Sequence, residues 1–170
     1  MRWTERKFDF TIPEALFPVV VERLRGTPAR LEDRVRGLPP DILTRRDGDA
    51  WSIQEQIGHL LDLDELHSGR LDDFLAGAEV LRAADMANRK TWEARHNERP
   101  IEELLAGFRR ERMCFVARLD AWDPDLVSLT ALHPRLGKPM RVLDMAFFTA
   151  EHDDHHLAEI TKLIRRFSPH

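Results

Sequence analysis

Cysteine is almost absent from the sequence, because Cys114 is the only one among 170 residues. A single cysteine excludes an intramolecular disulfide framework, and it excludes a zinc site built from several cysteines. Long hydrophobic runs are also missing. The longest, residues 15–21 and 145–150, fall short of the roughly 20 apolar residues that span a bilayer. We therefore expect neither a disulfide-stabilised secreted domain nor a membrane protein.

Basic residues are not in excess, with 26 lysines and arginines against 30 aspartates and glutamates, and the net charge is −4. Nucleic acid is therefore not an expected partner, because binding to its phosphates relies on a basic surface. The first ten residues, MRWTERKFDF, lack the apolar core of a signal peptide. We expect a cytoplasmic protein whose length corresponds to one domain, residues 1–170.

Glycine and proline are few, with 8 and 10 residues, and most of them mark the ends of predicted helices. Thr11 and Glu14 fit a capping box, which predicts a helix from about residue 11. Gly26 is expected to end this helix. Thr27–Pro28 is expected to begin another, since proline suits the first turn of a helix. Pro39–Pro40 then closes this second segment.

Two further helices have clearer patterns. Ser52 and Glu55 form another capping box, and the helix that follows is expected to reach about Gly77. Pro100 suits the first turn of the next helix. The residues of one face repeat every three or four positions over more than about five turns. They are Ile101, Leu104, Leu105, Phe108, Arg112, Phe115, Val116 and Leu119.

The last helix is expected from about Arg141 to Phe167. The polar, irregular residues 79–99 predict a long crossover connection with a short helix near residues 85–94. Strand signals are scarce, so residues 126–140 are expected to form a loop that turns at Gly137. Four long helices, one long crossover and one shorter connection predict an all-α fold, a four-helix bundle.

Histidines are the residues with the most informative spacing. His152 and His156 are four apart, which places both imidazoles on one face of a helix and suits a shared metal ion. Spacing alone is weak evidence, because random placement of 8 histidines gives about 0.4 such pairs. The alternative is a pair of histidines that are hydrogen-bonded within the core.

A helical wheel of the last helix separates these histidines from their neighbour. His152 and His156 lie on the apolar face together with Thr149 and Asp153, whereas His155 points away from it. Four polar groups on a buried face require hydrogen bonds or a ligand, because burying them unpaired is costly. The second helix offers His59 or His67 as a third ligand, and spacing does not decide between them.

Two segments of the sequence resemble a known family. The segment WSIQE, followed by His59, Leu60 and Asp62, resembles the second-helix motif of the DinB-like superfamily, which includes the YfiT-type proteins. The segment HDDHHLAEI, which begins at His152, resembles the fourth-helix motif of the same superfamily, an H-x-x-x-H pair. The resemblance extends over essentially the whole chain.

The resemblance implies a four-helix bundle that binds a divalent metal ion, Zn²⁺ or Ni²⁺, through His59, His152 and His156. Three imidazoles leave coordination positions open for water or substrate. Relatives include transferases that use low-molecular-weight thiols such as bacillithiol or mycothiol, in which the metal would lower the thiol pKa. The resemblance also implies a small-molecule substrate and a homodimer.

Several polar residues are candidates for supporting roles. Asp62 or Asp153 would orient a ligand or accept a proton, and the alternative for each is an ordinary solvated or capping aspartate. Arg135 and Lys138 would bind an anionic group of a thiol cosubstrate, unless they are ordinary surface cations. Polar residues of the crossover would line the mouth of the site or form a solvated loop. These are Asn88, Arg89, His96 and Asn97.

Three interpretations follow from the sequence. The first is a metal-dependent enzyme, most simply an S-transferase or a hydrolase. The second is a metal-binding or stress-response protein without catalysis. The third is a structural bundle with no metal. Trp51 is expected to pack under the start of its helix, and Cys114 to be a partly buried, inert thiol. Phe147 and Phe148 point to different sides of the last helix, which would leave one available for a second subunit.

Overall fold

The computed structural model describes residues 2–168. Six α-helices and one two-stranded hairpin form its regular structure, with short 3₁₀ turns between them. The helices are α1 (Phe17–Val35), α2 (Pro40–Thr44), α3 (Ile53–Leu75), α4 (Arg89–Glu93), α5 (Ile101–Asp120) and α6 (Val142–Phe167), and the strands are β1 (Thr130–His133) and β2 (Lys138–Arg141). None of the helices in this range is both long and apolar enough to cross a membrane.

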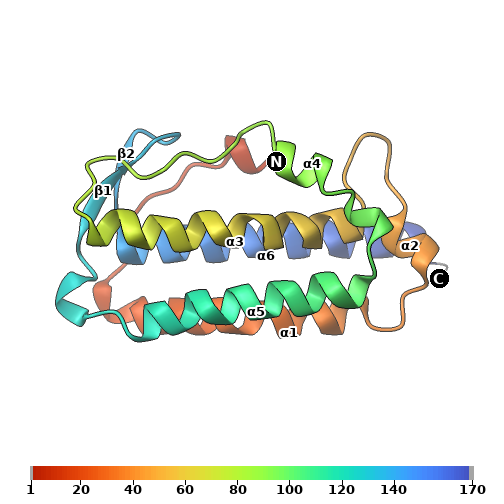
Figure 1. Cartoon of the computed structure of the whole chain (residues 1–170), viewed down its shortest axis with the longest axis horizontal. Helices are drawn as coiled ribbons and strands as arrows, with labels where there is room; N and C mark the ends of the chain where they lie inside the picture. Colours follow the sequence, from red (N-terminus) through yellow and green to blue (C-terminus); the bar gives the residue numbers. More distant parts are fainter. Residues whose placement is uncertain (1, 169–170) are drawn as a thin grey trace.

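The four long helices α1, α3, α5 and α6 form the predicted bundle. Helix α3 packs against α5 and α6, and α1 packs against the same two helices. Helices α3 and α5 run in the same direction, because residues 76–100 cross back over the length of the bundle between them (Figure 1). This segment is the expected long crossover, and its short helix α4 is confirmed within the expected range.

The start of α3 follows the predicted capping box. The Ser52 hydroxyl accepts a hydrogen bond from the Glu55 backbone N–H at 3.1 Å. The Glu55 carboxylate in turn accepts one from the Ser52 N–H at 2.9 Å. These reciprocal bonds satisfy two N–H groups that the helix itself leaves without acceptors. They fix the first turn of α3, on which the first candidate ligand lies.

The predicted break near residue 26 is wrong. Helix α1 begins at Phe17, not near Thr11, and continues without interruption through Gly26 and Pro28 to Val35. An internal proline costs about 3 kcal/mol. Side chains on both sides of it are buried in one continuous stripe, and each buried aliphatic side chain contributes about 1.5–3 kcal/mol. Tertiary packing therefore outweighs the local signal.

The predicted loop at residues 126–140 is also corrected, because it contains an antiparallel hairpin. Strand β1 pairs with β2 from Thr130–Arg141 to His133–Lys138. The turn uses Gly137, as expected, with φ of 62°. The crossover joins the hairpin through a bridge between Val80 and Leu132. The hairpin thus covers the end of the bundle at which α3 and α5 finish (Figure 1).

A layer of buried polar residues separates two apolar clusters inside the bundle. Arg112 of α5 is fully buried in this layer, where its guanidinium pairs with Asp64 of α3 and Asp153 of α6. Thr27 of α1 also donates to Asp153, at 2.8 Å. Buried charges are tolerated only when they are paired and hydrogen-bonded, and this network satisfies them with residues from all four long helices. The histidines lie at the same level.

Candidate metal centre

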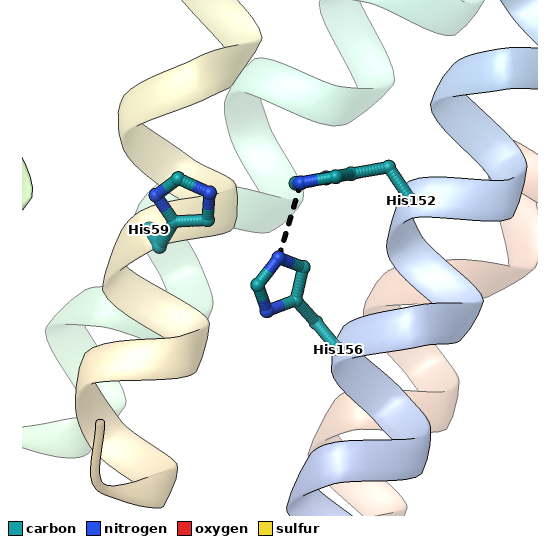
Figure 2. A group of neighbouring side chains, drawn as sticks. All are labelled: His59, His152 and His156. Atoms are coloured by element: carbon teal, nitrogen blue, oxygen red, sulfur yellow. Dashed lines mark hydrogen bonds between the residues drawn. The ribbon is translucent and has the colours of Figure 1, made fainter. Parts of the chain in front are cut away.

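Three histidines converge between α3 and α6. His59 projects from α3, and His152 and His156 project from successive turns of α6 toward it (Figure 2). One ring nitrogen from each lies within 4.8 Å of the others. The Nε2 atoms of His152 and His156 are 3.1 Å apart. All three side chains are buried. The structure therefore brings together the three residues that the resemblance singled out, and His59 rather than His67 completes the group.

A short chain of hydrogen bonds orients His59. Its Nδ1 lies 3.1 Å from the Thr91 hydroxyl, which donates its only hydrogen to Asp62 Oδ2 at 2.9 Å. Thr91 must therefore accept a hydrogen bond from His59 Nδ1–H. This fixes the tautomer, and the lone pair of Nε2 remains free for a ligand. Asp62, predicted to orient a ligand, lies one hydroxyl group away from His59.

Gln56 orients the second imidazole. Its side-chain oxygen accepts a hydrogen bond from His156 Nδ1, so the lone pair of His156 resides on Nε2. Neither Gln56 nor Thr91 was predicted from the sequence. Gln56 precedes His59 by three residues on α3, a spacing that places the two on one helix face. Thr91 lies in the irregular crossover, where the sequence has no pattern that identifies it.

Burial holds the three imidazoles in the neutral form. It lowers the pKa of His59 to about 4 and that of His152 and His156 well below the ordinary value of 6.5. Neighbouring histidines lower these pKa values further, because imidazolium ions repel each other, whereas the charge of Asp62 opposes the shift of His59. Neutral imidazole is the form that binds a metal ion.

The cluster fits a divalent cation. The His152 and His156 Nε2 atoms face each other, and His152 Nδ1 is buried without a hydrogen-bond partner among residues 2–168. Buried polar groups of native proteins are nearly always paired. Three nitrogen donors with convergent lone pairs suit Zn²⁺ or Ni²⁺.

The histidines form part of the wall of a cavity of about 770 Å³. Trp51 covers one side of the cavity, and the centroid of its ring lies 4.5 Å from that of the His59 ring. Trp3, from the N-terminal segment, packs against His152, with 4.9 Å between the two ring centroids. His155 was expected to point away from the site, yet it also lines the cavity. The polar face of α6 therefore borders the cavity as well.

The polar residues of the crossover occupy different places. Asn88 lines the cavity. His96 is buried, and its Nε2 lies 2.9 Å from Asp62 Oδ2. Asn97 accepts a hydrogen bond from the Ser52 hydroxyl, and Arg89 is exposed and pairs with Asp85. Of the four, only Asn88 is in contact with the cavity.

The remaining candidate residues also lie in different parts of the structure. Asp153 pairs with Arg112 in the centre of the bundle. Arg135 lines the cavity, whereas Lys138 donates to the Phe8 carbonyl at 2.8 Å and lies outside the lining. Cys114 is exposed, not partly buried as expected.

Comparison with known proteins gives a consistent result. A family model described as the DinB superfamily matches residues 23–160. The structure of YfiT from Bacillus subtilis, described as "a probable metal-dependent hydrolase with an unusual four-helix bundle topology", superposes with a TM-score of 0.81 at 22% identity. That match covers 95% of this chain and 93% of YfiT. A protein from Streptococcus pneumoniae superposes with a TM-score of 0.69 at 11% identity, over 96% and 94% of the two chains. No curated protein sequence matches significantly.

Proposed function

Because the chain belongs to the DinB superfamily, we propose that it is a metal-dependent enzyme whose divalent cation is held by His59, His152 and His156. The observation that carries the proposal is the convergence of three neutral imidazoles on the wall of a large cavity. Zn²⁺ and Ni²⁺ are the candidate ions, since imidazole is a good ligand for both. When bound, the cation supplies Lewis acidity, which lowers the pKa of a thiol or a water molecule at an open position.

The surrounding side chains orient two of the three imidazoles, those of His59 and His156. Thr91 and Asp62 keep the proton of His59 on Nδ1, and Gln56 does the same for His156. Each Nε2 is thereby presented toward the centre of the cluster without reorganisation. Asp62 also stabilises the positive charge that His59 acquires when it donates electrons to a cation, because the Thr91 hydroxyl transmits the hydrogen bond.

The two tryptophans limit access of water to the histidines. Trp51 packs on His59 and, with ring centroids 6.3 Å apart, on His156. Trp3 packs on His152. Exclusion of water from this part of the wall would strengthen electrostatic interactions there and protect a reactive nucleophile from side reactions with water. The open side of the histidine cluster faces the cavity, where a substrate would bind.

The proposed reaction is transfer of a low-molecular-weight thiol, such as bacillithiol or mycothiol, to an electrophile. The cavity volume of about 770 Å³ lies in the upper part of the range of ligand pockets, roughly 300–1,000 Å³, and would accommodate a thiol together with a small electrophile. Hydrolysis is the second candidate, and it is favoured by the description of YfiT as a probable metal-dependent hydrolase.

Activity assays with zinc- or nickel-loaded protein test the two candidates. Protein and a fluorogenic electrophile are combined with each thiol in turn, and separately with ester and amide substrates. Thiol-dependent turnover that is lost in His152→Ala and retained in Thr161→Val, a variant of the same helix outside the cavity, would support the transferase. Turnover of esters or amides without thiol would favour the hydrolase. Stoichiometric metal without turnover in either assay would leave a metal-binding protein without catalysis.

We propose that the chain forms a homodimer, as the resemblance implies. The sequence suggested that Phe147 or Phe148 is available for a partner. Phe148 is instead buried, and Phe147 is half-buried with the Arg23 guanidinium 5.7 Å from its ring centroid. A dimer would therefore use another surface. Light scattering at several protein concentrations tests this proposal, and a mass of one chain throughout would refute it.

A further inference from the structure

The end of the cavity nearest the hairpin holds two arginines that form no ion pair with residues 2–168. Arg70 of α3 and Arg135 of the β1–β2 turn both line the cavity. Arg70 is only 2% exposed. Its Nε donates to the Arg82 carbonyl at 3.2 Å, the one hydrogen bond that its side chain makes to residues 2–168. The nearby carboxylate of Asp73 is already engaged by Arg82.

Arg135 is half-buried and equally free of carboxylates. Its guanidinium lies 5.7 Å from the centroid of the Phe148 ring. Its Nη2 is buried and has no hydrogen-bond partner in the described part of the chain. The two carboxylates of the lining, Asp85 and Glu159, form ion pairs of their own, with Arg89 and Lys162.

The two arginines make this end of the cavity positively charged. Burial is the main cause that lowers the pKa of Arg70 to about 10; the charge of Asp73 opposes this shift, and the charges of Arg135 and Arg82 add to it. Burial also lowers the pKa of Arg135. Between them His133 is neutral, because burial and the two arginines lower its pKa to about 4. Both guanidinium groups remain charged at neutral pH, and burying them without a counter-ion is costly.

The two arginines lie in line with the histidine cluster. His59, Leu63, Leu66 and Arg70 all line the cavity from one face of α3. Arg70 follows His59 by eleven positions along α3, which corresponds to roughly 16 Å between their Cα atoms. The wall between them is largely apolar, with Leu63, Leu66 and Phe148. A ligand that extends along this wall would meet two cations at one end and three imidazoles at the other.

We propose that Arg70 and Arg135 bind the oxyanion, a carboxylate or a phosphate, of an organic substrate whose apolar body extends toward the three histidines. The proposed anion site depends only on the two arginines. The statement that the other end of the ligand reaches the histidines rests on the proposed function. Guanidinium groups suit this task, because their planar donors bind carboxylate and phosphate in pairs. The substrate class is therefore an amphipathic organic anion that carries its reactive group away from its charge.

The experiment measures binding of hexanoate and of its uncharged analogue hexanamide by calorimetry at neutral pH. Inorganic phosphate serves as a second anionic probe. The full chain is used both metal-free and zinc-loaded. Arg70→Gln and Arg135→Gln each remove one cation of the site. Lys162→Gln is the matched control, because it removes a cation of the same cavity that is already paired with Glu159. Circular dichroism shows whether each variant folds.

We expect hexanoate, but not hexanamide, to bind the metal-free protein. Either arginine substitution should weaken the binding roughly tenfold or more, as expected for loss of a charge-assisted hydrogen-bonded pair. Lys162→Gln should leave the affinity unchanged. If Arg70→Gln does not fold, Arg135→Gln carries the test, since Arg135 is only half-buried and makes no hydrogen bond within residues 2–168.

Three results would overturn the proposal. The first is equal affinity for hexanoate in wild type and Arg135→Gln. The second is binding only to zinc-loaded protein, which would assign the carboxylate to the metal. The third is no saturable binding of either anion at about 10 mM, an affinity too weak for a built site. Metal content measured on the same samples separates the two hypotheses. Arginine-dependent binding to a protein that takes up no metal would keep the anion site and refute the metal centre.

Discussion

Thr91→Val isolates the hydrogen bond that orients His59. Valine has nearly the shape of threonine, so the substitution removes the hydroxyl and leaves the packing of Thr91 unchanged. His59 Nδ1–H then loses its acceptor, and Asp62 keeps its contact with His96. Thr91 and His59 are each 4% exposed, so little of the contact that is lost is open to bulk water.

The expected magnitude follows from this burial. A buried donor without an acceptor costs about 1–3 kcal/mol of folding free energy. Loss of a partner that orients a metal ligand lowers metal affinity about 10–100-fold, or roughly 1.4–2.8 kcal/mol. Metal-free Thr91→Val should therefore melt lower by about 2–4 °C for each kcal/mol lost. Its zinc affinity should fall by one to two orders of magnitude, roughly.

The assay is a competition for zinc between protein and a chromophoric chelator, together with thermal unfolding of the metal-free protein. Thr161→Val is the matched control, since Thr161 donates only to the Leu157 carbonyl of its own helix and does not line the cavity. An unchanged zinc affinity in Thr91→Val, with a lower melting temperature, would refute the orienting role and leave Thr91 as a structural residue.

Three further predictions concern stability and geometry. Arg112→Ala should destabilise the fold by about 3–5 kcal/mol in chemical unfolding, because it leaves two carboxylates buried without their cation; a loss below about 1 kcal/mol would contradict the pairing. His133 has a pKa lowered to about 4, so between pH 6.5 and 4 the unfolded chain binds more protons, and stability falls as the pH falls. His133→Gln should make the pH dependence of stability shallower. The same slope in wild type and variant would show that His133 does not contribute to it. Gly58→Ala would place its Cβ 2.2 Å from the His96 ring, so it should displace His96 and lower both melting temperature and zinc affinity. A wild-type melting temperature together with a wild-type zinc affinity would show that displacing His96 affects neither the fold nor the metal site.

The sequence predicted the bundle and three of its long helices, α3, α5 and α6, because a helix that buries one face carries a periodic pattern of apolar residues within its own segment. Local signals were less reliable. Gly26 and Pro28 predicted a helix boundary, but the packing of α1 against α5 and α6 overrides them. The hairpin was missed because each strand has four residues and is stabilised by its pairing partner, which a local pattern cannot identify.

The candidate site was predictable in part for the same reason. His152 and His156 share a helix, so their spacing reveals their common face. His59 lies on another helix, and the choice between His59 and His67 required the resemblance to a family. Arg70 and Trp3 reach the cavity from α3 and from the N-terminal segment, and their role depends on how these segments pack together. Such a convergence has no local sequence pattern.

Elemental analysis of the untagged protein, purified without chelators or immobilised metal, would show whether the three histidines hold a metal ion. We expect about one zinc or nickel ion per chain, as three convergent imidazoles would hold. The triple variant His59→Ala/His152→Ala/His156→Ala should fold and contain none, whereas His67→Ala should retain the metal. Protein that contains no metal as purified and binds none on titration would contradict the account.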